Sequence, residues 1–202
     1  MKFILGQKIE MSQTFDKEGN IVPATLVMAG PITATQIKTK EKDGYTAIQF
    51  GFIGKKKRIK KTEKGKEFKY LKEFNCGDVS SLKPGDNIDV SAFLEGDKVE
   101  VSGIAKSKGF QGVVKRHGFH GGPRTHGQKH SEREPGSIGS TAPQRVFKGT
   151  RMAGRTGGER MTVKNLKIIK IDKNKNELWI SGAVPGKRGT LLEIKSSETK
   201  LK

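Results

Sequence analysis

The stretch Met161-Thr-Val-Lys-Asn-Leu-Lys-Ile-Ile-Lys-Ile-Asp-Lys-Asn-Lys-Asn-Glu-Leu-Trp-Ile-Ser181 carries the pattern that decides the fold. Apolar and β-branched residues recur through 161–171 and 177–181, and the polar run Asp-Lys-Asn-Lys-Asn separates them at 172–176. Such runs, bounded by turn-forming residues, are typical of β-strands. The stretch therefore predicts two strands that are joined as an antiparallel hairpin.

The same pattern recurs upstream, where short β-branched runs alternate with Gly, Asn, Asp and Pro. A second hairpin is predicted from 88–94 and 98–102, across the turn Glu95-Gly96-Asp97. No segment keeps a 3.6-residue apolar period, so the pattern favours a mainly β protein, with an antiparallel β-barrel as its body. The further predicted strands lie at 22–27, 33–37 and 46–53.

Residues 103–160 differ in kind from both flanks. They hold 13 of the 26 glycines and all four histidines, but no Asp, Trp or Tyr. They show no helix or strand pattern, and structureless connections this long are uncommon inside a compact domain. The sequence thus predicts a body made of 1–102 and 161–202, with 54–66 as a basic linker or loop, and an extended arm at 103–160.

The charge of the chain points to a polyanionic partner. There are 40 Lys and Arg against 21 Asp and Glu, which gives a formal net charge of +19 and a pI near 10.0. Binding to the phosphates of a nucleic acid would relieve the repulsion among these cations and release the counterions of the nucleic acid. Nucleic acid is therefore the first-ranked class of partner, and acidic membranes are the second. No apolar run is long enough to span a bilayer, which predicts a cytoplasmic protein without a membrane partner.

The arm has too few apolar side chains to offset the entropy of ordering its backbone. It is therefore expected to take up its conformation against RNA, with glycines allowing close approach to phosphates and arginines binding phosphate bidentately or stacking on bases. The predicted RNA-binding residues are Lys106, Lys108, Lys115, Arg116, His117, Arg124, His126, Lys129, His130, Arg133, Arg145, Lys148, Arg151, Arg155 and Arg160.

Six ordered motifs carry a resemblance to a known family. They lie at 105–116, 125–131, 133–139, 146–149, 151–154 and 182–186. The chain resembles the bacterial-type L-three family of large-subunit ribosomal proteins, and the match runs over nearly the whole length.

The resemblance implies a translation-protein-like barrel and an arm that threads through large-subunit ribosomal RNA. It also implies neighbouring large-subunit ribosomal proteins, an early role in subunit assembly, a ribosome-bound protein in the cytoplasm, and no enzymatic activity. The arm would reach toward the peptidyl transferase centre with an uncharged tip, made of Ser137, Ile138, Gly139, Ser140, Thr141, Ala142 and Pro143.

Rival chemistries have weaker support in the residues. His117, His120, His126 and His130 could suggest a metal site, but the glycines and Pro123 among them disfavour a helix that would align two of them, and no Cys is near. A hydrolase using these histidines would lack an Asp in the arm. The stretch 182–188 lacks phosphate-loop spacing and is interpreted as a turn. We therefore predict no metal, no cofactor and no small-molecule substrate.

Three alternatives stay open at this point. A free-standing nucleic-acid chaperone or single-strand binder would explain the charge, although aromatic residues for base stacking make up only 6% of the chain. The basic run 54–61 either touches RNA or forms a solvated face. Trp179 either stacks on a base or is partly buried in the core, and burial is favoured because it lies within an alternating strand.

Overall fold

The computed structural model describes residues 2–15, 18–57, 59–75 and 82–196. The chain divides into two compact units, Met1–Ile104 with Arg160–Lys202, and Ala105–Glu159. We call the first unit the body and the second the inserted unit. No helix among the described residues is long and apolar enough to cross a membrane.

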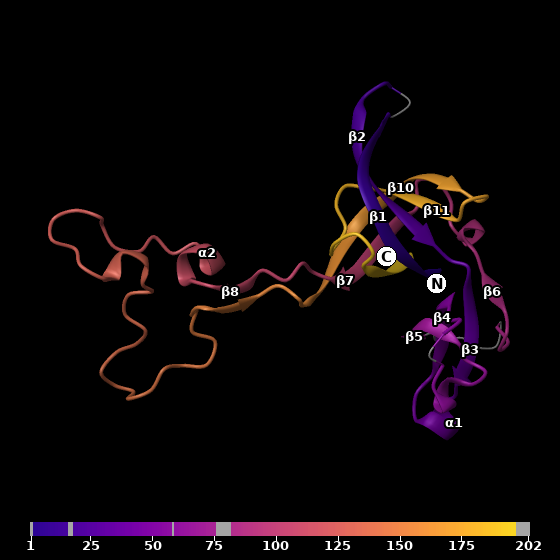
Figure 1. Cartoon of the computed structure of the whole chain (residues 1–202), viewed down its shortest axis with the longest axis horizontal. Helices are drawn as coiled ribbons and strands as arrows, with labels where there is room; N and C mark the ends of the chain where they lie inside the picture. The colour runs from indigo at the N-terminus through magenta and orange to yellow at the C-terminus, as the bar shows by residue number, and fades with distance from the viewer. Residues whose placement is uncertain (1, 16–17, 58, 76–81, 197–202) are drawn as a thin grey trace, which may run out of the picture. The chain divides into compact units, whose positions relative to one another are not determined.

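Six antiparallel strands of the body close into a barrel (Figure 1). Each strand pairs with the next, and β1 pairs with both β12 and β2, which completes the ring. In ring order the strands are β1 (Phe3–Phe15), β12 (Leu191–Ser196), β7 (Lys98–Ile104), β10 (Arg160–Asp172), β11 (Glu177–Ser181) and β2 (Ile21–Ala29).

The barrel interior is filled by alternate side chains of its strands. On β11, Leu178 and Ile180 are fully buried, whereas Trp179 between them is half-buried on the opposite face. On β12, Leu192 and Ile194 are likewise fully buried. Trp179 is thus partly covered, as favoured from the sequence, but it lies on the outer face of the barrel wall and not in the core.

A second sheet of the body shares this core. Phe50 and Phe74 of this sheet pack against Phe3 of the barrel, with ring centroids 5.7 and 4.3 Å from that of Phe3. Its strands, in sheet order, are β5 (Phe68–Asn75), β4 (Ala47–Gly54), β3 (Ile32–Lys38) and β6 (Asn87–Ile88). The short helices of the body are α1 (Lys40–Asp43), η1 (Lys61–Glu63) and η2 (Val90–Ala92).

Several predicted strands are confirmed. The hairpin at 161–181 is formed by β10 and β11, and the runs at 22–27, 33–37 and 46–53 lie in β2, β3 and β4. The predicted linker or loop at 54–66 joins β4 to β5 and contains η1, although Arg58 lies outside the described residues.

The predicted hairpin between 88–94 and 98–102 is wrong. Only β6 forms at its start, and it pairs with β3, while β7 pairs with β10 and β12. Val90 and Phe93 are both buried, and the Phe93 amide donates to the Val90 carbonyl (3.1 Å) in a 3-10 turn. A spacing of three between buried side chains suits a tight helical turn and not a strand, where the period is two.

A charged cluster joins three strands on the surface of the body. The Glu193 carboxylate on β12 accepts a hydrogen bond from Arg160 of β10 (2.6 Å) and pairs with Lys72 of β5 (3.2 Å). Burial disfavours the ionised form of this side chain, but the bonds from Arg160 and Lys72 hold the pKa of Glu193 below its ordinary value. The ion pairs therefore stabilise the folded body while Glu193 is ionised.

We expect Glu193→Gln to lower the free energy of unfolding by about 1 kcal/mol near pH 7, because it removes these charge-assisted bonds. A lowered carboxyl pKa contributes stability above the unfolded pKa, and that stability is lost as the pH falls through the folded pKa. The difference between the variant and the parent should therefore shrink as the pH falls through the folded pKa of Glu193, as measured by urea unfolding near pH 7 and at a pH below that pKa. The exposed Glu41→Gln serves as the control, and an equal loss at both pH values would contradict the account.

Candidate nucleic-acid interface

The inserted unit contains short regular elements, which corrects the expectation that 103–160 has no helix or strand pattern. Its two ends pair as a ribbon in which Phe110 lies opposite Arg155. The Ala105 amide donates to the Glu159 carbonyl at 2.9 Å. The elements are β8 (Gly109–Gln111), α2 (Val113–His117), η3 (Ser131–Arg133) and β9 (Gly154–Thr156).

Two glycines allow the chain segments of this unit to approach closely. Gly157 has a φ of +76°, and a Cβ there would lie 2.1 Å from the Lys106 carbonyl oxygen. A Cβ on Gly154 would lie 2.5 Å from Nη1 of Arg116. The sequence argument assigned glycines to RNA approach. At position 157, where the close neighbour is backbone and φ is positive, glycine is needed for packing within the unit, whereas at 154 the neighbour is the mobile end of an arginine side chain.

Basic side chains dominate the surface of the inserted unit. Residues 105–159 contain 11 Lys and Arg and three Glu, a formal charge of 11 − 3 = +8. Apart from Arg116 and His117, which are half-buried, every predicted RNA-binding residue is exposed. Arg124 and Glu132 form an ion pair at 2.7 Å, and we find no other ion pair within 105–159, all of which the structure describes. Most of these cations are therefore free to contact an external anion.

Arg160 is the one predicted RNA contact that lies outside the inserted unit. It belongs to the body, on β10, and its guanidinium is bound to Glu193. RNA would have to compete with this carboxylate for Arg160. Its role as a contact stays a prediction, weaker than that of the exposed arginines at 151 and 155.

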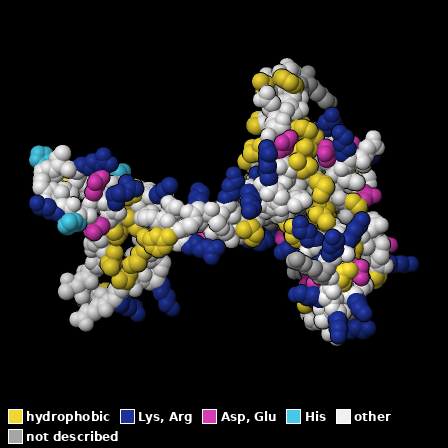
Figure 2. All heavy atoms as spheres, viewed as in Figure 1, with side chains coloured by type: hydrophobic (Ala, Val, Ile, Leu, Met, Phe, Trp, Pro, Cys, Tyr) yellow, Lys and Arg dark blue, Asp and Glu magenta, His cyan; other side chains and the backbone are white. Residues whose placement is uncertain are grey.

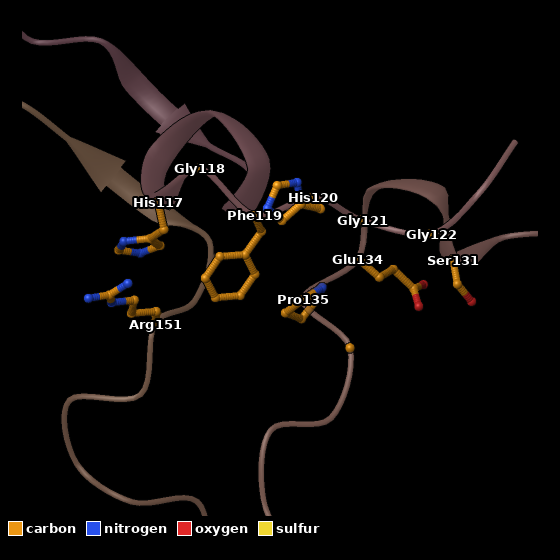
Figure 3. A pocket seen from close by; sticks show the side chains of 11 residues that line it. His117, Gly118, Phe119, His120, Gly121, Gly122, Ser131, Glu134, Pro135 and Arg151 are labelled. Atoms are coloured by element: carbon orange, nitrogen blue, oxygen red, sulfur yellow. The ribbon is translucent and has the colours of Figure 1, made fainter.

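A hollow of about 550 Å³ lies in the inserted unit, next to the end of α2 (Figure 3). The Phe119 ring is directed into it, with His117 and Arg151 on one side and Pro135 on the other. The ring centroids of His117 and Phe119 are 6.0 Å apart. A half-buried aromatic ring beside a guanidinium is an arrangement that can stack an unpaired base and bind its phosphate.

Hydrogen bonds from α2 to the returning chain position one wall of this hollow. Nη1 of Arg116 donates to the Met152 carbonyl at 2.8 Å, and Nε2 of His117 lies 3.1 Å from the same oxygen. Gly118 ends the helix with a φ of +73°. Phe119 and Pro135 were not among the predicted contacts, although an aromatic residue between His117 and His120 was a signal in the sequence.

The histidines are only partly brought together. His117 and His120 line the hollow, whereas His126 and His130 do not. His126 has a φ of +60° in a turn, so the chain there is not helical. Among the described residues, no three His, Cys, Asp or Glu side chains are grouped so as to hold a metal ion.

The predicted tip, 137–143, is exposed throughout. Oγ of Ser137 donates to the Gly139 carbonyl at 2.8 Å, and the Arg145 amide donates to the Pro143 carbonyl at 2.7 Å, so the segment reverses the chain. The Arg145 guanidinium lies over the Phe147 ring at 5.6 Å from its centroid. Cations therefore adjoin the tip, while the tip itself has none.

Comparison with known proteins decides the family. The model of the family "Ribosomal protein L3" matches residues 80–178. A protein of Prochlorococcus marinus (strain MIT 9515), named large ribosomal subunit protein uL3, is 49% identical over 205 residues, covering 97% of this chain and 94% of its own. The chain belongs to the ribosomal protein L3 family.

Other L3 relatives also match over nearly the whole chain. Proteins of Dehalococcoides mccartyi (strain BAV1) and Desulfitobacterium hafniense (strain Y51), both named large ribosomal subunit protein uL3, are each 46% identical and cover 96% and 97% of this chain. Members of the L3 family are structural proteins and not enzymes, which supports the prediction that this chain has no catalytic activity. The residues matched by the L3 family model include the whole inserted unit.

Proposed function

We propose that this L3-family chain is a structural component of the large ribosomal subunit and binds large-subunit ribosomal RNA through its inserted unit. The observation that carries the proposal is the formal charge of +8 on 105–159, with nearly all its cations exposed and only one of them in an ion pair. Unpaired arginines and lysines bind phosphates, which fixes the position of the protein on folded RNA.

We further propose that the chain supports early subunit assembly in the cytoplasm, next to other large-subunit ribosomal proteins. In this proposal the uncharged segment 137–143 reaches toward the peptidyl transferase centre. Its small, exposed side chains permit close approach to a crowded surface, and its lack of charge makes it a poor phosphate binder.

The competing function is that of a free-standing nucleic-acid chaperone. Its best support is the exposure of Phe110 (75%) and Phe147 (57%), which are available for stacking on single strands. Two such rings are too few to follow successive bases, and membership in the L3 family favours the ribosomal role.

Sedimentation of a cell lysate separates the two functions. We expect the full chain to migrate with large ribosomal subunits, and to leave that fraction when high salt strips proteins from the subunit. Migration with mixed nucleic acid would support the chaperone, and migration as a free protein would contradict both.

A further inference from the structure

Strands β1 and β2 continue past the barrel as a two-stranded ribbon (Figure 1). The pairing of β1 with β12 covers Phe3–Gln7, and that of β2 with β11 covers Ala24–Met28. The pairing of β1 with β2 continues to Phe15 opposite Ile21. Among the residues that the structure describes, residues 10–15 are therefore paired in sheet only with β2, and residues 21–23 only with β1.

One face of this ribbon is apolar and exposed. Met11, Gln13 and Phe15 alternate along β1, and their partners nearest the turn are Pro23 and Ile21. The exposed fractions are 51% for Met11, 67% for Phe15 and 60% for Ile21. Hydrophobic side chains gather at the end of the ribbon on the face drawn in Figure 2. A shallow hollow of about 450 Å³ is lined by Met11, Ser12, Gln13, Ile21 and Pro23.

The charge of the ribbon is opposite to that of the rest of the chain. The described residues of the ribbon, 10–15 and 18–23, contain Glu10 and Glu18 and no Lys or Arg, a formal charge of −2 in a chain of +19. Arg188 pairs with Glu10 at 3.4 Å, so one of these acids is already partly compensated. An acidic surface repels phosphates, whereas the inserted unit, with a formal charge of +8, attracts them.

We propose that the apolar face of this ribbon is a docking surface for a second protein of the large subunit, one that is rich in Lys and Arg and presents an apolar patch. The proposal rests on the proposed ribosomal function. Large apolar side chains at the centre of an interface contribute most of its affinity, and opposite charges at the rim set orientation and association rate. Basic proteins are the partners that an acidic, apolar ribbon fits.

Pro23 limits the way in which the partner can dock. It has no backbone N–H, so the outer edge of β2 lacks a donor beside the exposed face. Addition of a partner strand along that edge is disfavoured, and the partner is expected to cover the side chains of the ribbon face.

A photo-crosslinking residue in place of Phe15, in the full chain reconstituted into large subunits, tests the nature of the occupant. We expect an adduct with another basic ribosomal protein, identified by mass spectrometry. An adduct with RNA, or no adduct in subunits that contain the chain, would overturn the proposal. The same residue in place of the exposed Leu94 is the control for nonspecific capture.

A binding titration with the identified protein measures the contribution of the face. Phe15→Ser with Ile21→Ser should weaken the complex by about 100-fold, because each buried large side chain contributes roughly tenfold. Leu94→Ser should change it less than about twofold. Equal losses in both variants, or none, would count against the docking face.

The ribbon variant also separates this proposal from the proposed function. Its affinity for ribosomal RNA and the salt dependence of that affinity should match the parent, because the altered side chains carry no charge. If the parent chain does not bind ribosomal RNA, the proposed function is contradicted. If the parent binds RNA and the ribbon variant binds both the RNA and the partner protein as the parent does, only the docking proposal is contradicted.

Discussion

Binding of the full chain to large-subunit ribosomal RNA is expected to weaken by about 10³- to 10⁵-fold between roughly 50 and 200 mM monovalent salt. The reason is counterion release, since about six or more cations of the inserted unit are free to neutralise phosphates. The measurement is the slope of log affinity against log salt concentration. A nearly flat titration would rule out phosphate contact as the main source of affinity.

Matched variants locate the contacts within this slope. Arg151→Ala with Arg155→Ala should make the slope shallower by about one unit for each contact removed, since both side chains are exposed and make no ion pair among the described residues. Arg124→Ala should change the slope less, because its guanidinium is paired with Glu132. Arg160→Ala is expected to have a smaller effect for the same reason, with Glu193 as its partner. A uniform change in all these variants would show that net charge alone governs binding.

Variants of the tip and of the basic surface are expected to fail at different stages. Gly139→Trp should leave subunit incorporation nearly unchanged. It should alter the rate of peptidyl transfer or the sensitivity to antibiotics that bind the peptidyl transferase centre. The nearest atom to a Cβ at Gly139 is the Arg145 carbonyl oxygen, 3.9 Å away, so the chain itself has room for a side chain there. The effect would then come from what the tip contacts and not from misfolding.

Charge reversal on the basic surface should act first on assembly. Lys115→Glu with Arg133→Glu replaces attraction by repulsion at two exposed positions and should reduce affinity for the RNA by about 100-fold or more. Arg116→Glu is a less clean variant, because Nη1 of Arg116 also donates to the Met152 carbonyl within the unit. Incorporation is measured by sedimentation and peptidyl transfer on purified subunits. Identical profiles for the tip and surface variants would remove the basis for assigning them different roles.

The sequence by itself determined the mainly β class, the hairpin at 161–181 and the basic character of 103–160. These features are local. A strand, a polar turn and a cluster of cations can each be recognised within one segment of the sequence, because side-chain alternation and turn formation depend on residues that are near neighbours in the chain. The motifs in 105–186 were sufficient to suggest the family for the same reason, since each lies within a few residues.

The tertiary structure alone decided which strands pair and which cations are free. The barrel closes by pairing Phe3 with Lys195, and the predicted partner of 98–102 was displaced by strands from the far end of the chain. In the sequence, Arg160 does not differ from the other cations of the arm, whereas in the structure β12 places Glu193 beside it. The pairing of Phe3 with Lys195 spans nearly the whole chain, and Arg160 and Glu193 are 33 residues apart. Local periodicity contains no information about which distant segment will supply the partner.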